Sequence, residues 1–121
     1  MISMIEAICK AENIYLDPLP GLKRLKAVAM KVPDADGDIR CIGYDETLVD
    51  WDRISAIAHE IGHHVLGHFD DDTHLGANLG KPSEKKRRNE MEAQVFAATF
   101  TAMAMFMKHV QLLTGKDELH A

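Results

Sequence analysis

The sequence predicts an α+β fold, and three patterns indicate it. In the first eleven residues, apolar side chains recur every three or four positions, as on one face of a helix. Two short apolar segments then flank a turn rich in Asp and Gly, which is typical of a β-hairpin. Two longer helical stretches follow. We therefore expect an N-terminal helix, a short antiparallel hairpin or sheet, a central helix and a long buried C-terminal helix.

The first half of the chain supplies the N-terminal helix and the hairpin. Residues Ile2 to Ala11 contain no Pro or Gly and predict the helix. The run from Asp17 to Gly21 holds two prolines and predicts a loop. We expect antiparallel strands at Lys26 to Val32 and at Arg40 to Tyr44. Between them, Pro33 to Gly37 predicts a turn of more than two residues.

The central helix is expected from about Trp51 to Leu66. Asp50 or Asp52 can cap its N-terminus, where a negative charge also suits the helix dipole. Gly67 is a plausible stop signal.

An irregular loop rich in Asp, Gly and Pro follows up to Ser83, which is a candidate cap for the last helix. That helix runs to about Leu113 and is closed by Gly115. Residues Val95 to Met107 are apolar nearly all the way round, which predicts that this part is buried.

Composition indicates one domain spanning residues 1–121. Hydrophobic residues make up 46% of the chain and charged residues 27%, which excludes disordered and fibrous classes. A net charge of −5 argues against nucleic acid as the main partner, so the basic run Lys85 to Arg88 is interpreted as a solvated helix face. No signal peptide or membrane-spanning run is visible. Since Cys9 and Cys41 are far apart, we expect reduced thiols in a cytoplasmic protein.

The segment His59-Glu60-Ile61-Gly62-His63 matches the metal-binding pattern HExxH. Residues four apart lie on the same face of a helix, so His59 and His63 can aim two imidazole nitrogens at one point. Neutral imidazole is a good ligand for zinc. Glu60 can lie beside the open position of the ion, where a carboxylate can take a proton from water. Ile61 is expected to face the core with the rest of an apolar stripe, which comprises Ile54, Ala58 and Val65.

A catalytic zinc needs a third protein ligand from elsewhere in the chain. The pattern HExxHxxGxxH fails, because Leu66 stands at the glycine position and Phe69 at the last histidine position. The donors that remain are His64, His68, His74, Asp70, Asp71, Asp72, Glu84, Glu90 and Glu92. Glu90 and Glu92 are about 200° apart on a helix, so only one of them can face the metal. The apolar pattern does not choose between them.

Two segments together resemble the ImmA/IrrE family of zinc metallopeptidases. They are Ala56-Ile57-Ala58-His59-Glu60-Ile61-Gly62-His63-His64-Val65-Leu66-Gly67-His68 and Glu90-Met91-Glu92-Ala93-Gln94-Val95-Phe96-Ala97-Ala98. The family has an AHELGH-type helix after a short sheet, and then a helix that opens with E-x-E-A-N-x-F-A-A. The resemblance extends from the hairpin to about Ala98. Two positions depart from it, since Gln94 replaces the usual Asn or Asp and Thr99 to Met103 replaces a leucine-rich ending with its Met-Pro.

The resemblance implies a small zincin-like domain of the gluzincin type with Zn²⁺ as its cofactor. His59, His63 and Glu90 would hold the ion, and Glu60 would be the catalytic base. The resemblance also implies a cytoplasmic bacterial or phage protein that cuts a helix-turn-helix repressor and so switches on a mobile element or a stress response.

The leading hypothesis is thus a zinc endopeptidase. By analogy with other HExxH enzymes, the strand around Ile39 to Ile42 is expected to bind a substrate segment as an added strand. His64, His74 and Tyr44 are candidates for stabilising the oxyanion. The alternative function is a regulatory protein-binding module that retains zinc but hydrolyses peptides slowly or not at all. A structural zinc domain is disfavoured, because such sites are mostly rich in Cys.

Overall fold

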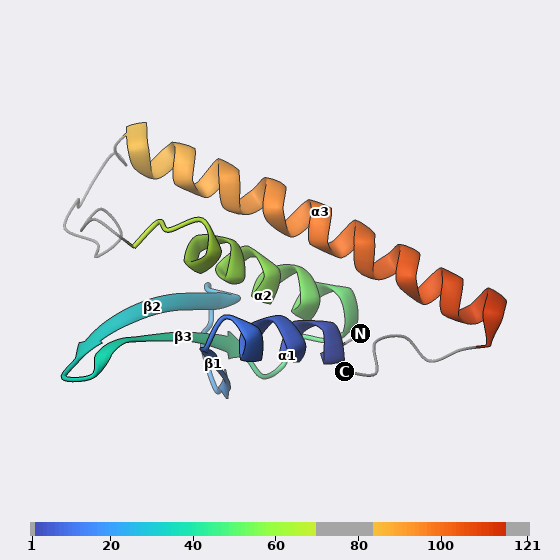
Figure 1. Ribbon diagram of the computed structural model, residues 1–121, viewed down its shortest axis with the longest axis horizontal. Coiled ribbons are helices and arrows are strands. Elements are labelled where there is room, and N and C mark those ends of the chain that lie inside the picture. The colour runs from blue at the N-terminus through green and yellow to red at the C-terminus, as the bar shows by residue number, and fades with distance from the viewer. Residues whose placement is uncertain (1, 70–83, 116–121) are drawn as a thin grey trace.

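The computed structural model describes residues 2–69 and 84–115, which form three helices and a three-stranded sheet (Figure 1). In chain order the elements are α1 (Ile2–Ala11), β1 (Ile14–Leu19), β2 (Ala27–Asp34), β3 (Gly37–Asp45), α2 (Asp50–Val65) and α3 (Glu84–Thr114). The predicted α+β class is confirmed, and α1 has the predicted bounds.

Strands β2 and β3 form the predicted antiparallel hairpin, but the turn between them is tighter than expected. Asp34 pairs with Gly37, so only Ala35 and Asp36 lie in the turn. The strand continues through Pro33 because β2 is an edge strand of the sheet, whose order is β1-β3-β2. Proline lacks an N–H and is tolerated where that group would face away from the ladder.

The loop predicted over Asp17 to Gly21 is wrong in its first part, since β1 continues to Leu19. This strand pairs in parallel with β3, from Ile14 opposite Arg40 to Leu19 opposite Asp45. Pro18 is accommodated because β1 is the other edge of the sheet. The strand starts after Asn13, whose left-handed conformation (φ 57°) ends α1 and redirects the chain.

The hydrophobic core lies where α1, the sheet and α2 meet. Its buried members are Ile5, Cys9, Ile14, Ile42, Ile54, Ile57 and Ile61. Ile61 and Ile54 face this core as predicted, and Ala58 is also fully buried. Val65 does not continue the stripe, because it lies in the last turn of α2 and is 39% exposed.

Helix α2 begins and ends by different means. The N-cap is Val49, and no side chain bonds to the cap, so the prediction that Asp50 or Asp52 caps the helix is wrong. Both carboxylates fall inside the first turn instead, where they still suit the helix dipole. At the C-terminus Gly67 adopts φ 73° directly after the C-cap residue, and the predicted stop signal is confirmed.

The prediction that α3 is buried is wrong. It packs on α2, which separates it from the sheet and α1 (Figure 1). With 31 residues α3 is about 46 Å long, whereas the 16 residues of α2 span about 24 Å, so α2 cannot cover it. Only one face of α3 is buried, at Asn89, Ala93, Ala97 and Ala104. Large apolar side chains on its other faces are exposed: Met91, Val95, Met103, Met105, Phe106, Leu112 and Leu113.

Among residues 2–69 and 84–115, no helix combines the length and the hydropathy needed to cross a membrane.

Gly115 ends α3 as predicted. It adopts φ 69°, and its N–H donates to the carbonyl oxygen of Gln111. Several sequence predictions lie outside the described residues: the acidic run Asp70 to Asp72, the candidate His74 and the Ser83 cap.

Candidate metal centre

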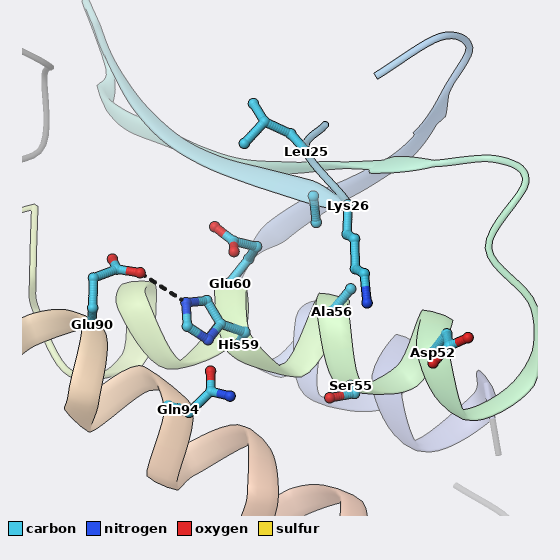
Figure 2. Close-up of a pocket in the computed structure, with 10 residues that line it drawn as sticks. Leu25, Lys26, Asp52, Ser55, Ala56, His59, Glu60, Glu90 and Gln94 are labelled. Atoms are coloured by element: carbon cyan, nitrogen blue, oxygen red, sulfur yellow. Dashed lines mark hydrogen bonds and ion pairs between the residues drawn. The ribbon is translucent and has the colours of Figure 1, made fainter. Parts of the chain in front are cut away.

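Three side chains from α2 and α3 converge on one point. Nε2 of His59 lies 3.2 Å from Oε1 of Glu90, and Nε2 of His63 lies 2.8 Å from Oε2 of the same carboxylate. One ligand atom from each residue lies within 4.8 Å of the others. The two histidines are one helical turn apart on α2, and Glu90 reaches them from the second turn of α3. Figure 2 shows the contact between Glu90 and His59. The choice between Glu90 and Glu92 is thus made by the packing of α3 on α2.

This donor set suits a divalent metal ion. Two imidazoles and one carboxylate leave a position open on a four-coordinate ion, as catalytic zinc sites do. Ligands of tetrahedral zinc lie about 2.0–2.2 Å from the ion, so their atoms are roughly 3.3–3.6 Å apart. The separations of 2.8 and 3.2 Å between the Glu90 oxygens and the two histidines need only small shifts to reach that range. His59, His63 and Glu90 could therefore hold a metal ion.

Glu60 lies beside this cluster with an unusual carboxyl group. Its pKa is raised to about 8, first by burial and then by the negative charge of Glu90. A hydrogen bond from the backbone N–H of Ala29 in β2 acts in the opposite direction. Figure 2 shows the Glu60 side chain directed toward β2, above the ring of His59. The carboxylate is thus held between the candidate metal position and the sheet edge.

A pocket of about 350 Å³ opens in front of these residues. Its walls come from α2, from the start of α3 and from the segment that leads into β2. Gln94, one turn beyond Glu90, lines it near His59, and Lys26 lines the opposite end with Ser55 (Figure 2). The pocket is large enough for one or two amino-acid side chains.

Two further residues extend the cluster behind His63. Nδ1 of His63 lies 2.8 Å from Nδ1 of His68, and Nε2 of His68 lies 2.7 Å from Oε1 of Glu92. His63 and His68 are 3% and 5% exposed, whereas the side chain of Glu92 is half-exposed. Glu92 therefore contacts the cluster through His68, while Glu90 contacts the predicted ligands directly.

His64 and Tyr44 are not placed to act on a substrate in this pocket. Nε2 of His64 lies 3.0 Å from the carbonyl oxygen of Cys41 in β3, so its ring is turned to the sheet and is buried. Tyr44 lies under the guanidinium of Arg53, 5.6 Å from the ring centroid, and lines a different pocket beside α1. Neither side chain lines the pocket, so the structure does not support the expected oxyanion role of either residue. His74, the third candidate, lies outside the described residues.

The strand around Ile39 to Ile42 cannot bind a substrate segment, because β3 is the central strand. The free edge near the site belongs to β2. The N–H of Asp45 donates to the carbonyl of Lys26, and bonded pairs alternate along an antiparallel ladder. Ala27, Ala29 and Lys31 therefore direct their backbone groups to the free edge, which agrees with the bond from Ala29 to Glu60.

The contact between His63, His68 and Glu92 is not visible in the sequence as such. His68 follows the helix stop, so helical periodicity does not apply to it. The left-handed conformation of Gly67 turns the chain back toward the last turn of α2, where the N–H of His68 donates to the carbonyl oxygen of His63 at 3.0 Å. Gly67 next to a histidine was the available signal, because a left-handed residue after a helix brings the next side chain back to its last turn.

No family model, no curated protein and no solved structure matches the chain.

Proposed function

We propose that the chain is a zinc-dependent endopeptidase with a small zincin-like fold, in which His59, His63 and Glu90 hold the ion. The observation that carries the proposal is the convergence of one ligand atom each from His59, His63 and Glu90 within 4.8 Å of one another. The paired motifs that resemble the ImmA/IrrE family support it. The pocket supports it as well, because His59 and Glu90 line it and a peptide bound there would lie next to the proposed ion.

A bound zinc would supply Lewis acidity, which polarises a carbonyl and makes water easier to deprotonate. The positive charge of a bound ion would favour the ionised form of Glu60. Its carboxylate would then accept the proton of the attacking water and later donate it to the leaving amine. Its position supports this role, because it lies in the same pocket as His59 and Glu90 and is held by the N–H of Ala29. The half-buried setting limits competing water around the carboxylate.

The substrate segment would bind along the free edge of β2. Backbone groups of Ala27 and Lys31 point to that edge, and Ala27 also lines the pocket. An extended peptide that pairs with such an edge gains main-chain hydrogen bonds without regard to its sequence. Side chains of the peptide would then meet Gln94 and Lys26 in the pocket.

The resemblance to ImmA/IrrE proteins points to a helix-turn-helix repressor of a phage or mobile element as the protein substrate, in a cytoplasmic setting. A repressor encoded beside the gene is therefore the first substrate to test. The alternative, a zinc-retaining binding module with little peptidase activity, is favoured by the exposed apolar side chains of α3.

Replacing Glu60 by Gln tests the proposed function. Glu60→Gln keeps the shape of the side chain and removes the base, so zinc affinity should stay within a few-fold while cleavage of the repressor falls about 10²- to 10⁴-fold. Glu46→Gln, an exposed change outside the pocket, is the matched control. Undiminished cleavage by Glu60→Gln would refute the role of this residue. A wild-type protein that binds zinc and the repressor but does not cut it would establish the binding module instead.

A further inference from the structure

Behind the proposed ligand His63 lies a chain of two short contacts. Nδ1 of His63 meets Nδ1 of His68 at 2.8 Å, and Nε2 of His68 meets the Glu92 carboxylate at 2.7 Å. Both rings are almost completely buried. Hydrogen bonds between buried groups are strong and strongly directional, because water does not compete for them. The arrangement therefore constrains which nitrogen of each ring carries the proton.

Counting the available protons shows which ring nitrogens carry them. Three contacts of the ring nitrogens of His63 and His68 matter here: one with Glu90, one between the two rings and one with Glu92. Each contact needs a proton or a cation between its two atoms, but two neutral imidazoles carry only two N–H protons. A cation on Nε2 of His63 leaves both protons for the other contacts. Then Nδ1–H of His63 donates to His68, and Nε2–H of His68 donates to Glu92.

We infer that His68 and Glu92 are positioning residues of the metal site, which fix the tautomer and the ring orientation of His63. The inference rests on the proposed function, because it requires a metal ion on His63. In this tautomer the lone pair on Nε2 of His63 points to the side of the ring that faces Glu90. A carboxylate at the far end of the chain also makes the imidazole a better donor to the metal, as partners of metal-bound histidines do.

A purely structural role for His68 makes a different prediction. The backbone of His68 is already tied to His63 by the bond from its N–H, so the turn after α2 has its own support. A side chain that only filled space would affect unfolding, and its replacement by another ring of similar size would leave metal affinity unchanged. A positioning residue affects metal affinity through its hydrogen bonds, and restoring those bonds restores affinity.

Zinc affinity, measured by competition with a chromophoric chelator on the full chain, tests the inference. His68→Phe should weaken zinc binding about 10- to 100-fold, the usual effect of losing a partner of a metal-bound histidine. Glu92→Ala should weaken it about 10-fold, and the double variant no further than His68→Phe, since Glu92 acts through His68. His68→Gln offers one acceptor and one donor at similar separation, so affinity should recover to within about 3-fold of wild type.

Two exposed changes, His109→Gln and Glu46→Gln, are the matched controls and should leave affinity unchanged. Wild-type affinity in His68→Phe, or additive losses in the double variant, would overturn the positioning role and leave the proposed function standing. A wild-type chain that binds no zinc would overturn both. Loss of cleavage in Glu60→Gln with intact zinc binding bears on the proposed function alone.

The nitrogen-15 spectrum of the zinc-loaded wild-type protein provides a test that needs no variant to fold. The histidine side-chain shifts report which ring nitrogen is protonated. We expect His63 to be protonated on Nδ1 and metal-bound on Nε2, and His68 to be protonated on Nε2 with a bare Nδ1. The reverse tautomer of His68 would overturn the inference.

Discussion

At the scale of single residues, burial controls the chemistry of Cys9. Its side chain is 3% exposed in the core between α1 and the sheet. Burial, and to a lesser degree the charge of Glu6, raises the pKa of its thiol from 9.0 to about 11. The thiolate is the reactive form of cysteine, so the thiol of Cys9 should be inert toward alkylating reagents at neutral pH.

The raised pKa of Cys9 predicts a loss of stability in alkali. Above pH 9 the unfolded chain gives up the thiol proton while the folded chain keeps it, so the free energy of unfolding falls until about pH 11. The contribution is fully present below pH 9. Between pH 8 and 10.5 the loss should be about 2 kcal/mol, from 1.36 kcal/mol per pKa unit.

Urea unfolding of wild type and Cys9→Ala at both pH values measures this effect. Cys9→Ala should be the less stable protein at pH 8, because it leaves a small cavity. At pH 10.5 the difference in the free energy of unfolding between wild type and Cys9→Ala should be smaller by about 2 kcal/mol, because only wild type loses the contribution of the thiol. Ile5→Val, a non-ionisable change in the same core, should keep a constant gap to wild type. A gap for Cys9→Ala that is the same at both pH values would contradict the prediction.

The residues of the site differ in how far the sequence predicts them. The spacing of His59 and His63 is enough to predict that their rings share a face, and their centroids lie 4.9 Å apart. Helical periodicity leaves Glu90 and Glu92 equivalent, because both precede an apolar stretch on all sides. Only the direction in which α3 crosses α2 separates them. The roles of His64 and His68 depend on a strand carbonyl and on a turn after the helix, which no local pattern encodes.

At the scale of elements, the close approach of α2 and α3 depends on Gly62. A Cβ atom at this position would lie 3.1 Å from Cβ of Phe96 and 3.2 Å from two of its ring atoms. Glycine inside a helix costs about 1 kcal/mol relative to alanine. At Gly62 this loss of helix stability allows Phe96 of α3 to come close to α2. Since Glu90 lies on α3 less than two turns before Phe96, the same contact fixes how near the carboxylate comes to His63.

Gly62→Ala should therefore move α3 away from α2. The gain of about 1 kcal/mol in helix propensity opposes an overpacking cost of about 1–3 kcal/mol, so the free energy of unfolding should change little or fall by up to about 2 kcal/mol. Zinc affinity should fall whichever sign the stability change takes. Ser55→Ala, an exposed change on α2, is the control for helix propensity. Unchanged zinc affinity in Gly62→Ala would show that this contact does not set the distance to Glu90.

The two faces of α3 should respond oppositely to substitution. Ala104 is completely buried and Phe106, two residues on, is 64% exposed. Ala104→Leu should reduce the free energy of unfolding by about 1–3 kcal/mol through overpacking. Phe106→Gln should change it by less than about 0.5 kcal/mol. Thermal unfolding of both variants, at a concentration where wild type is monomeric, checks the two expectations. A large fall in the free energy of unfolding of Phe106→Gln would show that the face of α3 carrying Phe106 is buried.

Elements were predictable where their pattern is local. The hairpin of β2 and β3 follows from apolar segments around an Asp-Gly turn, and α2 follows from its stripe of isoleucines. Strand β1 escaped prediction because it contains Pro18, which only its edge position tolerates. The burial of α3 was predicted wrongly because an apolar sequence does not reveal the length of the neighbouring helix. α3 is almost twice as long as α2.

At the scale of the whole molecule, the strand order is the feature that local patterns could not supply. The last strand in the sequence, β3, is the central strand of the sheet and lies between β1 and β2. The parallel pairing of β1 with β3 leaves β2 as the edge nearest α2, with Ala29 beside Glu60. Which strand is left as the edge beside Glu60 is thus decided by a contact between segments more than twenty residues apart in the chain.

The proposed metal would join two helices that belong to different parts of the chain. His59 and His63 lie on α2, while Glu90 lies on α3, 27 residues after His63 in the numbering. Only the folded chain brings the three ligand atoms together, so zinc should bind the folded state and stabilise it. At a free zinc concentration 100 times Kd the gain is about 2.7 kcal/mol. For a chain of this size that corresponds to a rise in Tm of roughly 10 °C.

Differential scanning calorimetry with and without zinc checks this prediction. The rise should grow with the logarithm of zinc concentration, be reversed by a chelator and persist in His109→Gln, which changes an exposed histidine of α3. His63→Ala and Glu90→Gln should each abolish most of it, although they change residues on different helices. If His63→Ala lost the rise and Glu90→Gln kept it, zinc would be bound by α2 alone, and the bridge between the helices would have to be abandoned.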